Sequence, residues 1–189
     1  MVNLYLFMSK VKDTHIKLNT PWFNLLEKTV LVERNDTEVQ EKYYSISADD
    51  YVCVLAVTKE GDFILVQQYR PAVEDVTMEL PAGHVENGET PLEAAKRELY
   101  EETGYLTEDI KFLGCLDPDT GRLSNKLWCF FADNVIFDTK SEAETGVSRI
   151  VVSKKQLNDL IVQGKFKHAL HIAVFFLAVQ NNLLSINKF

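Results

Sequence analysis

The sequence predicts an α/β fold, on the strength of three observations. Short runs of β-branched and aromatic residues, bounded by polar turns, indicate strands along most of the chain. A strongly capped helix stands near the middle, and two further helical segments lie near the carboxyl end. The length of 189 residues, with 46% hydrophobic and 25% charged residues, suits one domain or one domain with a small extension.

The first strands are predicted as two hairpins. Residues 25–32 and 39–46 read as extended segments joined by a polar turn, which predicts an N-terminal hairpin. Residues 51–57 and 63–68 are rich in Val, Ile, Leu and Phe, and they flank the polar turn at residues 59–62. We expect this second pair to form core strands.

The helix predicted at residues 91–102 has clear signals at both ends. Thr90 and Glu93 have the spacing of a capping box, and Pro91 stands at the first helical position, where its missing N–H costs nothing. Gly104 follows the last turn and suits a left-handed helix terminator.

The remaining elements follow from apolar runs and a second capping box at Ser153 and Gln156. Strands are predicted at residues 110–116, 127–132 and 147–152, and helices at 154–163 and about 168–184. The apolar run at residues 172–179 is interpreted as part of a buried helix. His168 and His171 are interpreted as packing or capping residues, because no acidic motif adjoins them.

Composition narrows the class of protein. The net charge of −8 argues against a nucleic-acid-binding surface, which would need clustered Lys and Arg. No stretch approaches the roughly 20 apolar residues that cross a bilayer, so no membrane segment is expected. Residues 1–8 lack the basic start and cleavage site of a secretory signal, which favours a cytoplasmic protein. Cys53, Cys115 and Cys129 lie in apolar runs and are expected to be reduced core residues.

The predicted helix 91–102 carries a face of carboxylates. Glu98, Glu101 and Glu102 stand at i, i+3 and i+4, so their side chains share one face. The other face is expected to carry Leu92, Ala95 and Leu99. Like charges at this spacing cost about 0.2 to 0.5 kcal/mol per pair, a penalty that a divalent cation would reverse. The alternative is a solvated acidic face with ordinary i, i+4 pairs through Arg97.

The segment around this helix resembles the signature of a known family. The motif consists of Gly83, five residues, Glu89, seven residues, Arg97-Glu98-Leu99, one residue, Glu101-Glu102, one residue, and Gly104-Tyr105. This spacing is similar to the Nudix box, with only Tyr105 standing where an aliphatic residue is commoner. The resemblance implies a Nudix-type α/β/α sandwich around a mixed β-sheet, and a hydrolase that splits a pyrophosphate bond.

The same resemblance implies the metal site. Glu98 and Glu102 would be the main ligands of Mg²⁺, for which Mn²⁺ could substitute. Glu101 and the Ala82 carbonyl would be additional ligands. Gly83, Glu89 and Arg97 would support these groups, with Arg97 orienting the carboxylates.

The flanking segments are similar to the ADP-ribose and ADP-sugar pyrophosphatases. The similarity rests on residues 66–71, on residues 79–83 and on the N-terminal hairpin. It implies that Arg70 contacts the substrate phosphates, with Glu79 in the same substrate-binding segment. A surface salt bridge is the alternative role for Arg70. It also favours Trp22 and Tyr44 for stacking on adenine, although plain packing is an equal alternative. Tyr43 and Tyr44 should point to opposite faces, because side chains alternate along a strand.

A further acid in a loop after the box is expected to act on the attacking water, and Glu142 and Glu144 are both candidates. The resemblance implies a homodimer in which residues 1–47 form an extension that contributes dimer and substrate contacts, with residues 48–189 as the hydrolase domain. The expected reaction is hydrolysis of a nucleoside diphosphate sugar, foremost ADP-ribose to AMP and ribose 5-phosphate.

One departure keeps other substrates open. Many members of the ADP-ribose group carry Glu where this chain has Lys126. GDP-mannose, a UDP-sugar or a dinucleoside polyphosphate are the alternative substrates. A non-catalytic nucleotide-sugar-binding regulator is a further alternative, against which the intact carboxylates and the absence of a basic recognition helix argue.

Overall fold

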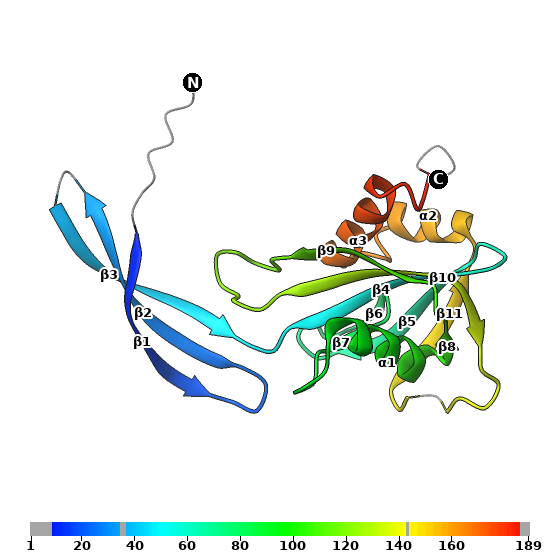
Figure 1. The fold of residues 1–189 in the computed structure, drawn as a ribbon, viewed down its shortest axis with the longest axis horizontal. Coiled ribbons are helices and arrows are strands. Elements are labelled where there is room, and N and C mark those ends of the chain that lie inside the picture. Colours follow the sequence, from blue (N-terminus) through cyan, green and yellow to red (C-terminus); the bar gives the residue numbers. More distant parts are fainter. Residues whose placement is uncertain (1–8, 35–36, 143, 186–189) are drawn as a thin grey trace, which may run out of the picture. The chain divides into compact units, whose positions relative to one another are not determined.

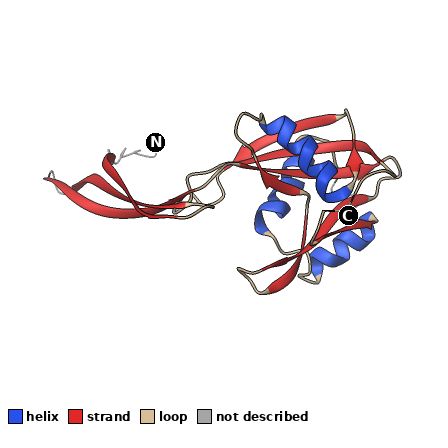
Figure 2. Cartoon of the chain, turned by 90° about the horizontal axis from the view of Figure 1, so that it is seen from below, coloured by secondary structure: helices blue, strands red, loops and turns tan. Residues whose placement is uncertain are grey.

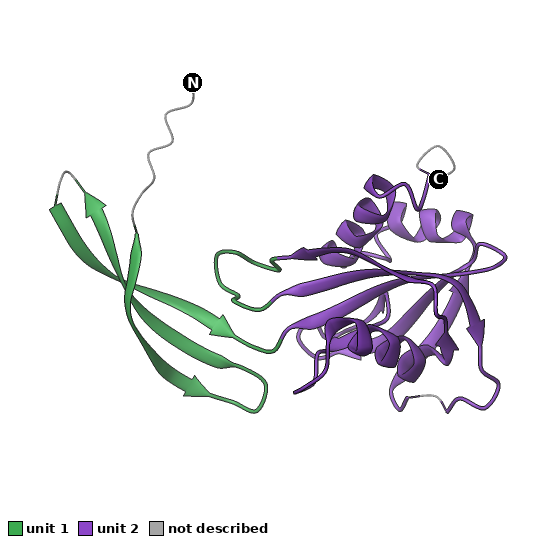
Figure 3. Cartoon of the chain, in the orientation of Figure 1, with its two compact units in different colours: residues 1–49, 117–125 green, residues 50–116, 126–189 purple. Residues whose placement is uncertain are grey.

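The computed structural model describes residues 9–34, 37–142 and 144–185. Residues 1–8, on which the prediction about a secretory signal depends, lie outside these ranges. The chain divides into two compact units, one of residues 1–49 and 117–125 and the other of residues 50–116 and 126–189 (Figure 3). The roles predicted for these parts of the chain, dimer and substrate contacts for residues 1–47 and hydrolysis for residues 48–189, stay predictions.

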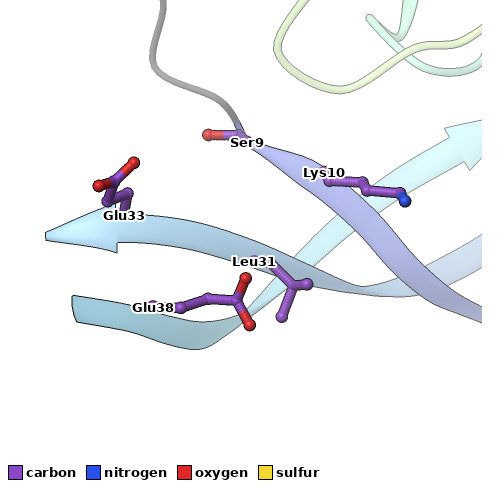
Figure 4. A pocket seen from close by; sticks show the side chains of 5 residues that line it. All are labelled: Ser9, Lys10, Leu31, Glu33 and Glu38. Atoms are coloured by element: carbon purple, nitrogen blue, oxygen red, sulfur yellow. The ribbon is translucent and has the colours of Figure 1, made fainter. Parts of the chain in front are cut away.

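The first unit is a three-stranded antiparallel sheet in the order β1-β2-β3. β2 (Asn24–Arg34) and β3 (Thr37–Ser47) are the hairpin that the sequence predicts. β1 (Lys10–Asn19) was not predicted, because its exposed residues are mostly polar and show no apolar alternation. A hollow of about 480 Å³ lies among Ser9, Lys10, Leu31, Glu33 and Glu38, none of which is a predicted site residue (Figure 4).

The loop of residues 117–125 belongs to the same unit. The amide of Ile46 donates to the Arg122 carbonyl at 2.7 Å, and the amide of Ser124 donates back to the Ile46 carbonyl at 3.1 Å. A parallel bridge between Ile46 and Leu123 accompanies these bonds. The end of β3 is therefore tied to a segment more than seventy positions later in the chain, which the sequence did not indicate.

The second unit is built on an eight-stranded mixed sheet in the order β11-β5-β4-β10-β8, with β6 on β5, β7 on β4 and β9 on β10. Its strands are β4 (Tyr51–Thr58), β5 (Phe63–Arg70), β6 (Asp75–Glu79), β7 (Ala82–His84), β8 (Tyr105–Leu106), β9 (Ile110–Leu116), β10 (Leu127–Phe137) and β11 (Val147–Val152). β4 and β10 run parallel at the centre, and their other pairings are antiparallel. The mixed sheet is thus confirmed, while β6, β7 and β8 add short strands around the motif.

Helices cover both faces of this sheet (Figures 1 and 2). Helix α1 (Pro91–Thr103) packs on one face, while α2 (Lys154–Val162) and α3 (Ala169–Gln180) lie on the other. Successive residues of β4 alternate between the two cores, with Val54 facing α1 and Leu55 facing α2 and α3. Burial on both faces explains why β4 reads as a continuous apolar run. The predicted α/β/α sandwich is confirmed.

Helix α1 has the ends that the sequence predicts. Thr90 and Glu93 form both bonds of the capping box, and Pro91 opens the helix. Gly104 follows with φ of 72°, the left-handed conformation that glycine adopts without steric cost. The second capping box, Ser153 with Gln156, is also present. Helix α3 is shorter than predicted, because it ends at Gln180, with Asn181 as its C-cap, rather than continuing to residue 184.

Two burial predictions were wrong. Leu92 is 43% exposed, and Ala94 is buried in its place. Leu92 lies in the first turn, at the margin of the stripe that packs on the sheet. Cys115 is exposed, whereas Cys53 and Cys129 are buried as expected. Cys115 is one of the exposed residues of β9, a strand that within the described ranges pairs with β10 alone and so lies at a sheet edge. Within the described ranges, no helix is long and apolar enough to cross a membrane.

Candidate active site

The three carboxylates of α1 differ in burial in the way that helix geometry dictates. The buried stripe of α1 includes Ala95 and Leu99. At about 100° per residue, Glu102 falls near the middle of that stripe, Glu98 at its margin and Glu101 outside it. Glu102 is accordingly buried, the Glu98 side chain is 12% exposed, and that of Glu101 is 51% exposed. The sequence predicted Ala95 and Leu99 on the face opposite the carboxylates, and this is wrong for Glu102, because Glu102 lies in the same buried stripe as these two residues.

Arg97 joins the loop before α1 to the carboxylates on the helix. Its Nε and Nη2 donate to the two oxygens of Glu89, at 3.0 and 2.9 Å. Nη2 also donates to the His84 carbonyl at 2.9 Å. Nη1 donates to Glu98 at 2.7 Å and to Glu101 at 3.0 Å. The bond to Glu89 foremost raises the pKa of Arg97, so the guanidinium remains charged. This arrangement orients two of the three carboxylates.

Gly83 lets the loop approach the helix closely. A Cβ at this position would overlap the carboxylate of Glu98, so any side chain would displace it. Gly83 lies in β7, which pairs with β4 through Val52. The glycine of the motif is therefore explained by contact with the Glu98 carboxylate rather than by a turn.

Ala82 meets the buried carboxylate of the cluster. Its amide donates to Glu102 Oε2 at 2.9 Å. Ala82 is the first residue of β7 and is paired with Cys53 on the central strand β4, which fixes its backbone. The predicted ligand residue thus lies beside Glu102, with its amide on the carboxylate.

Burial makes the ionised form of these carboxylates unfavourable. It is the main reason that the pKa of Glu102 rises to about 8, and the charges of Glu98 and Glu144 raise it further. The opposing effects of the Ala82 amide and of Arg70 are smaller. Burial also raises the pKa of Glu98. One buried and one half-buried acid with raised pKa values, beside the backbone of Ala82, form an oxygen donor set that fits a hard divalent cation such as Mg²⁺.

Arg70 and Glu79 form a second pair, adjacent to the motif in sequence. Arg70 Nε and Nη2 donate to the two oxygens of Glu79 at 2.8 and 2.7 Å, and the Thr77 hydroxyl donates to the same carboxylate. Burial pushes the pKa of Glu79 upward, but these hydrogen bonds outweigh it and lower the pKa to about 2. The two residues predicted to bind substrate therefore bind each other, through β5 and β6.

The two loop acids differ in their relation to the cluster. Glu144 contributes to the raised pKa values of both Glu98 and Glu102. Glu142 lines a hollow of about 360 Å³ that also borders Glu102. Both candidates thus lie on the side of α1 where the buried carboxylate is found, and the choice between them stays open.

Arg149 is a site-bordering residue that sequence reasoning missed. Its Nη1 donates to the Thr103 carbonyl at 2.7 Å, and its guanidinium lies 4.1 Å from the centre of the Phe137 ring. It supplies a cation to the carboxyl end of α1, whose last turn has no basic residue of its own. A single Arg within the strand β11 carried no signal for this role.

The aromatic candidates Tyr43 and Tyr44 of the N-terminal unit bond to different partners. The Tyr44 hydroxyl donates to Glu27 Oε2 at 2.8 Å, and the Tyr43 hydroxyl donates to the Gly121 carbonyl. Trp22 is 77% exposed in the connection between β1 and β2. The stacking of Trp22 or Tyr44 on a base stays a prediction.

His171 packs in the interior and His168 lies half-buried beside it, in line with the packing role that the sequence suggested. Their rings stack with centroids 3.9 Å apart, and His171 is 1% exposed. Burial lowers the pKa of His171 to about 3 and also lowers that of His168, so both rings are neutral near pH 7. The Leu80 amide donates to His171 Nδ1 at 3.0 Å, a contact that the sequence did not indicate.

The α/β/α sandwich and the carboxylate loop-helix motif define the class of this protein. The family model described as NUDIX domain matches residues 49–169, well over half of the chain. The chain belongs to the Nudix domain family.

Among its relatives, the chain is 37% identical over 94 residues to an ADP-ribose pyrophosphatase of Bacillus subtilis, covering 49% of this chain and 51% of the relative. It is 47% identical over 85 residues to a methanol dehydrogenase activator of Bacillus methanolicus, covering 45% of this chain and 41% of that protein. The chain therefore spans about half of the length of the first of these curated relatives and less than half of the second.

A solved structure titled as an ADP compounds hydrolase shares the fold. It aligns with a TM-score of 0.78 and covers 91% of this chain and 92% of its own, at 19% sequence identity. At that identity, the comparison supports the architecture alone.

Proposed function

We propose that this protein is a Mg²⁺-dependent hydrolase that splits the pyrophosphate bond of a nucleoside diphosphate sugar. The expected reaction converts ADP-ribose to AMP and ribose 5-phosphate. The observation that carries the proposal is the cluster around Glu102 and Glu98, two shielded carboxylates with raised pKa values beside the Ala82 backbone. The similarity to the ADP-ribose pyrophosphatase of Bacillus subtilis supports the substrate class.

One group of residues would bind the cation, and another would position the substrate. Glu98, Glu102 and the Ala82 carbonyl would hold Mg²⁺, with Glu101 as an additional ligand. A bound Mg²⁺ supplies neutralisation of phosphate charge and orientation of the attacking water. Arg97 keeps Glu98 and Glu101 oriented while its own charge stays paired with Glu89.

Arg70 would position the diphosphate. Its Nε and Nη2 are bonded to Glu79, so Nη1 is the nitrogen that we expect to meet a phosphate oxygen. Fixing a guanidinium through a buried carboxylate reduces the side-chain entropy lost when substrate binds. Glu142 or Glu144 would accept the proton of the attacking water.

A substrate panel with product identification tests the proposal. ADP-ribose, GDP-mannose, a UDP-sugar and a dinucleoside polyphosphate are incubated with the protein and Mg²⁺ in heavy-oxygen water, and products are identified by mass spectrometry. The proposal expects AMP and ribose 5-phosphate from ADP-ribose, with the label in the product whose phosphorus was attacked. Intact substrates after hours at high enzyme concentration would reject it. Preferred cleavage of another substrate in the panel, as Lys126 allows, would change the proposed substrate but retain the proposed hydrolysis of a pyrophosphate bond.

We further propose that the protein is a homodimer through its N-terminal unit. The three-stranded sheet β1-β2-β3 exposes the apolar residues Val11, Ile16 and Leu18 by 50%, 62% and 52%. A three-stranded sheet with exposed apolar side chains gains stability when a partner covers those side chains. Light scattering after gel filtration should give twice the mass of 21.6 kDa, and Ile16→Asp should shift the protein toward the monomer. A wild-type monomer at micromolar concentration would contradict the dimer.

A non-catalytic regulator is the alternative that uses the same fold. The relative from Bacillus methanolicus bears a name that refers to activation of another enzyme. Binding of a nucleotide sugar without turnover, measured by calorimetry in the presence of Mg²⁺, would favour this alternative over the hydrolase.

A further inference from the structure

A group of three potential metal ligands lies where the end of β6 meets the start of α3. Glu79, His168 and His171 each place one ligand atom within 4.8 Å of the other two, and Glu79 and His171 are buried. Two imidazoles and a carboxylate are a set that many divalent transition metals accept. The question is whether their lone pairs are available to an ion.

The hydrogen bonds of this group argue against a metal ion. A neutral imidazole has one nitrogen with a lone pair, and in His171 that nitrogen is Nδ1, which accepts the Leu80 amide at 3.0 Å. Nε2 therefore carries the proton and cannot act as a ligand. Glu79 already receives both bonds from the Arg70 guanidinium, whose charge would repel a cation at this position. What the group supplies is an acceptor for one backbone amide.

That amide belongs to the segment that leads into the motif. Leu80 lies between β6 and β7, and its side chain is fully buried. A buried amide without an acceptor would lose its hydration and gain no hydrogen bond. The contact with His171 therefore stabilises the backbone at Leu80. Helix α3 thereby reaches a segment that lies 91 positions earlier in the chain.

Three consecutive residues of this segment are each fixed by a different element. Leu80 is held by His171 on α3, the Pro81 carbonyl accepts the Val54 amide of β4 at 2.9 Å, and the Ala82 amide donates to Glu102 on α1 at 2.9 Å. Pro81 has no amide proton to add a further bond. The position of Ala82 against Glu102 therefore depends on the anchors at Leu80 and Pro81.

We propose that His171 is a positioning residue for the metal site, acting through the Leu80 amide to fix the backbone of Ala82. The proposal rests on the function proposed above, because the ligand roles of Ala82 and Glu102 come from it. His171 does not touch the cation or the substrate. It supplies an acceptor to the backbone strand that carries a ligand, as residues behind a metal site commonly do.

A pair of substitutions separates the acceptor from the bulk of the ring. His171→Asn keeps an acceptor on Cγ, in the position of Nδ1, whereas His171→Leu fills similar space with no acceptor. Leu157→Ala is the matched control, since Leu157 is fully buried on α2 in the same core but does not bond to Leu80. Thermal midpoints report the loss of stability in all three variants.

Binding of Mn²⁺ to the metal-free protein is the readout, measured by the electron paramagnetic resonance signal of the free ion. His171→Leu should raise the dissociation constant roughly 3- to 10-fold, below or at the low end of the range for partners that contact metal ligands directly. His171→Asn should recover most of that affinity. Leu157→Ala should leave the affinity unchanged while lowering the thermal midpoint. Wild-type affinity in a folded His171→Leu variant, or an equal loss in Leu157→Ala, would overturn the proposal.

Imidazole nitrogen chemical shifts in ¹⁵N-labelled wild-type protein provide a test that does not depend on a folded variant. The proposal requires the tautomer of His171 with the proton on Nε2, unaffected by added Zn²⁺. A proton on Nδ1, or a shift of the His171 signals on adding Zn²⁺, would overturn it in favour of a metal centre. Neither readout uses turnover. Protein that binds Mn²⁺ normally but cleaves nothing in the panel would remove the proposed hydrolysis and leave these results to decide the role of His171.

Discussion

Glu102 and Glu79 are carboxylates of similar burial with opposite electrostatics. Glu102 is 6% exposed and Glu79 is 2% exposed. The pKa of Glu102 is raised to about 8, chiefly because burial removes its hydration, while that of Glu79 is lowered to about 2 because Arg70 and Thr77 more than compensate for burial. The difference is the presence of a bonded cation. Glu79 is bonded to the Arg70 guanidinium, whereas among the described residues no side-chain cation is bonded to Glu102.

The comparison distinguishes a structural carboxylate from a candidate ligand. Leaving a buried acid without a full counter-charge costs stability, and such a cost is expected where an ion completes the site. Residue type and burial alone would class these two acids together. Their hydrogen-bond partners separate them, and the predictions below act on one member or the other.

Neutralising Glu102 should have the largest effect. Glu102→Gln removes a main ligand, so turnover should fall by roughly a thousandfold or more, equivalent to several kcal/mol of lost transition-state stabilisation. The thermal midpoint of the metal-free variant should equal or exceed that of the wild type, because an unfavourable buried charge is gone. Steady-state kinetics and calorimetry measure both. Glu108→Gln, on an exposed acid near the end of α1, is the control, and wild-type turnover in Glu102→Gln would reject the ligand assignment.

The pH dependence of metal-free stability should come next in size. Glu102 in the folded state has a raised pKa, so between about 4.5 and 8 the folded protein binds more protons than the unfolded chain, and stability falls as pH rises. The loss should reach up to about 4 kcal/mol at the alkaline end. Glu79 acts in the opposite sense, because its stabilisation is present above about 4.5 and is lost as pH falls toward 2.

Chemical denaturation in the presence of a chelator, repeated over this pH range, measures the free energy of unfolding on the acidic limb, set by Glu79, and on the alkaline limb, set by Glu102. Addition of Mg²⁺ should flatten the alkaline limb, and Glu102→Gln should flatten it without metal. A metal-free protein that gains stability between pH 5 and 8 would contradict the raised pKa of Glu102.

The loop acids give the next effect. Glu144 interacts electrostatically with both Glu98 and Glu102, so we expect Glu144→Gln to lower turnover by about 100-fold, near the low end for loss of a general base. Glu142→Gln should have a much smaller effect on turnover. The rate constant at saturating substrate and Mg²⁺ is the measurement, and a reversal of the two variants would assign the water to Glu142.

Removing Arg70, the partner of Glu79, should have the smallest of these effects, which is a loss of folding stability. Arg70→Met leaves a buried carboxylate without its cation, which should lower the free energy of unfolding by about 2 kcal/mol, less than for a fully buried pair because the Arg70 side chain is 42% exposed. The pKa of Glu79 should also rise in this variant, so that Glu79 would then resemble Glu102. The double variant Arg70→Met with Glu79→Met should recover much of the loss. Urea denaturation of the three proteins checks this, and full stability of the single variant would show that the pair contributes nothing.

Local signals explain which elements could be predicted. The two capping boxes, Pro91 and Gly104 act within a few residues of the helix ends that they define, so the sequence contains the whole cause. The central strand β4 was recognisable because both of its faces are buried. β1 gave no such signal, since its pairing with β2 depends on backbone hydrogen bonds and leaves all of its side chains exposed.

The candidate site was predictable in its members and not in its electrostatics. Spacing predicted Glu98, Glu101 and Glu102 on one face, and the family resemblance implied that this face binds a metal ion. Their different burial depends on how α1 packs against the sheet, which made Leu92 a wrong prediction for the same reason. The contacts of Arg149 with Thr103, and of His171 with Leu80, join residues far apart in sequence, so no local pattern indicates them.

The sequence by itself determined the motif from Gly83 to Tyr105, the caps of its helix and the shared face of its carboxylates, because these depend on residue type and helical spacing. The tertiary structure alone decided that Glu102 is buried beside the Ala82 amide while Glu79 is bonded to Arg70. The physical reason is that a pKa follows from hydration and neighbouring charge. Both are set by segments that meet only when the sheet and its two helical layers assemble.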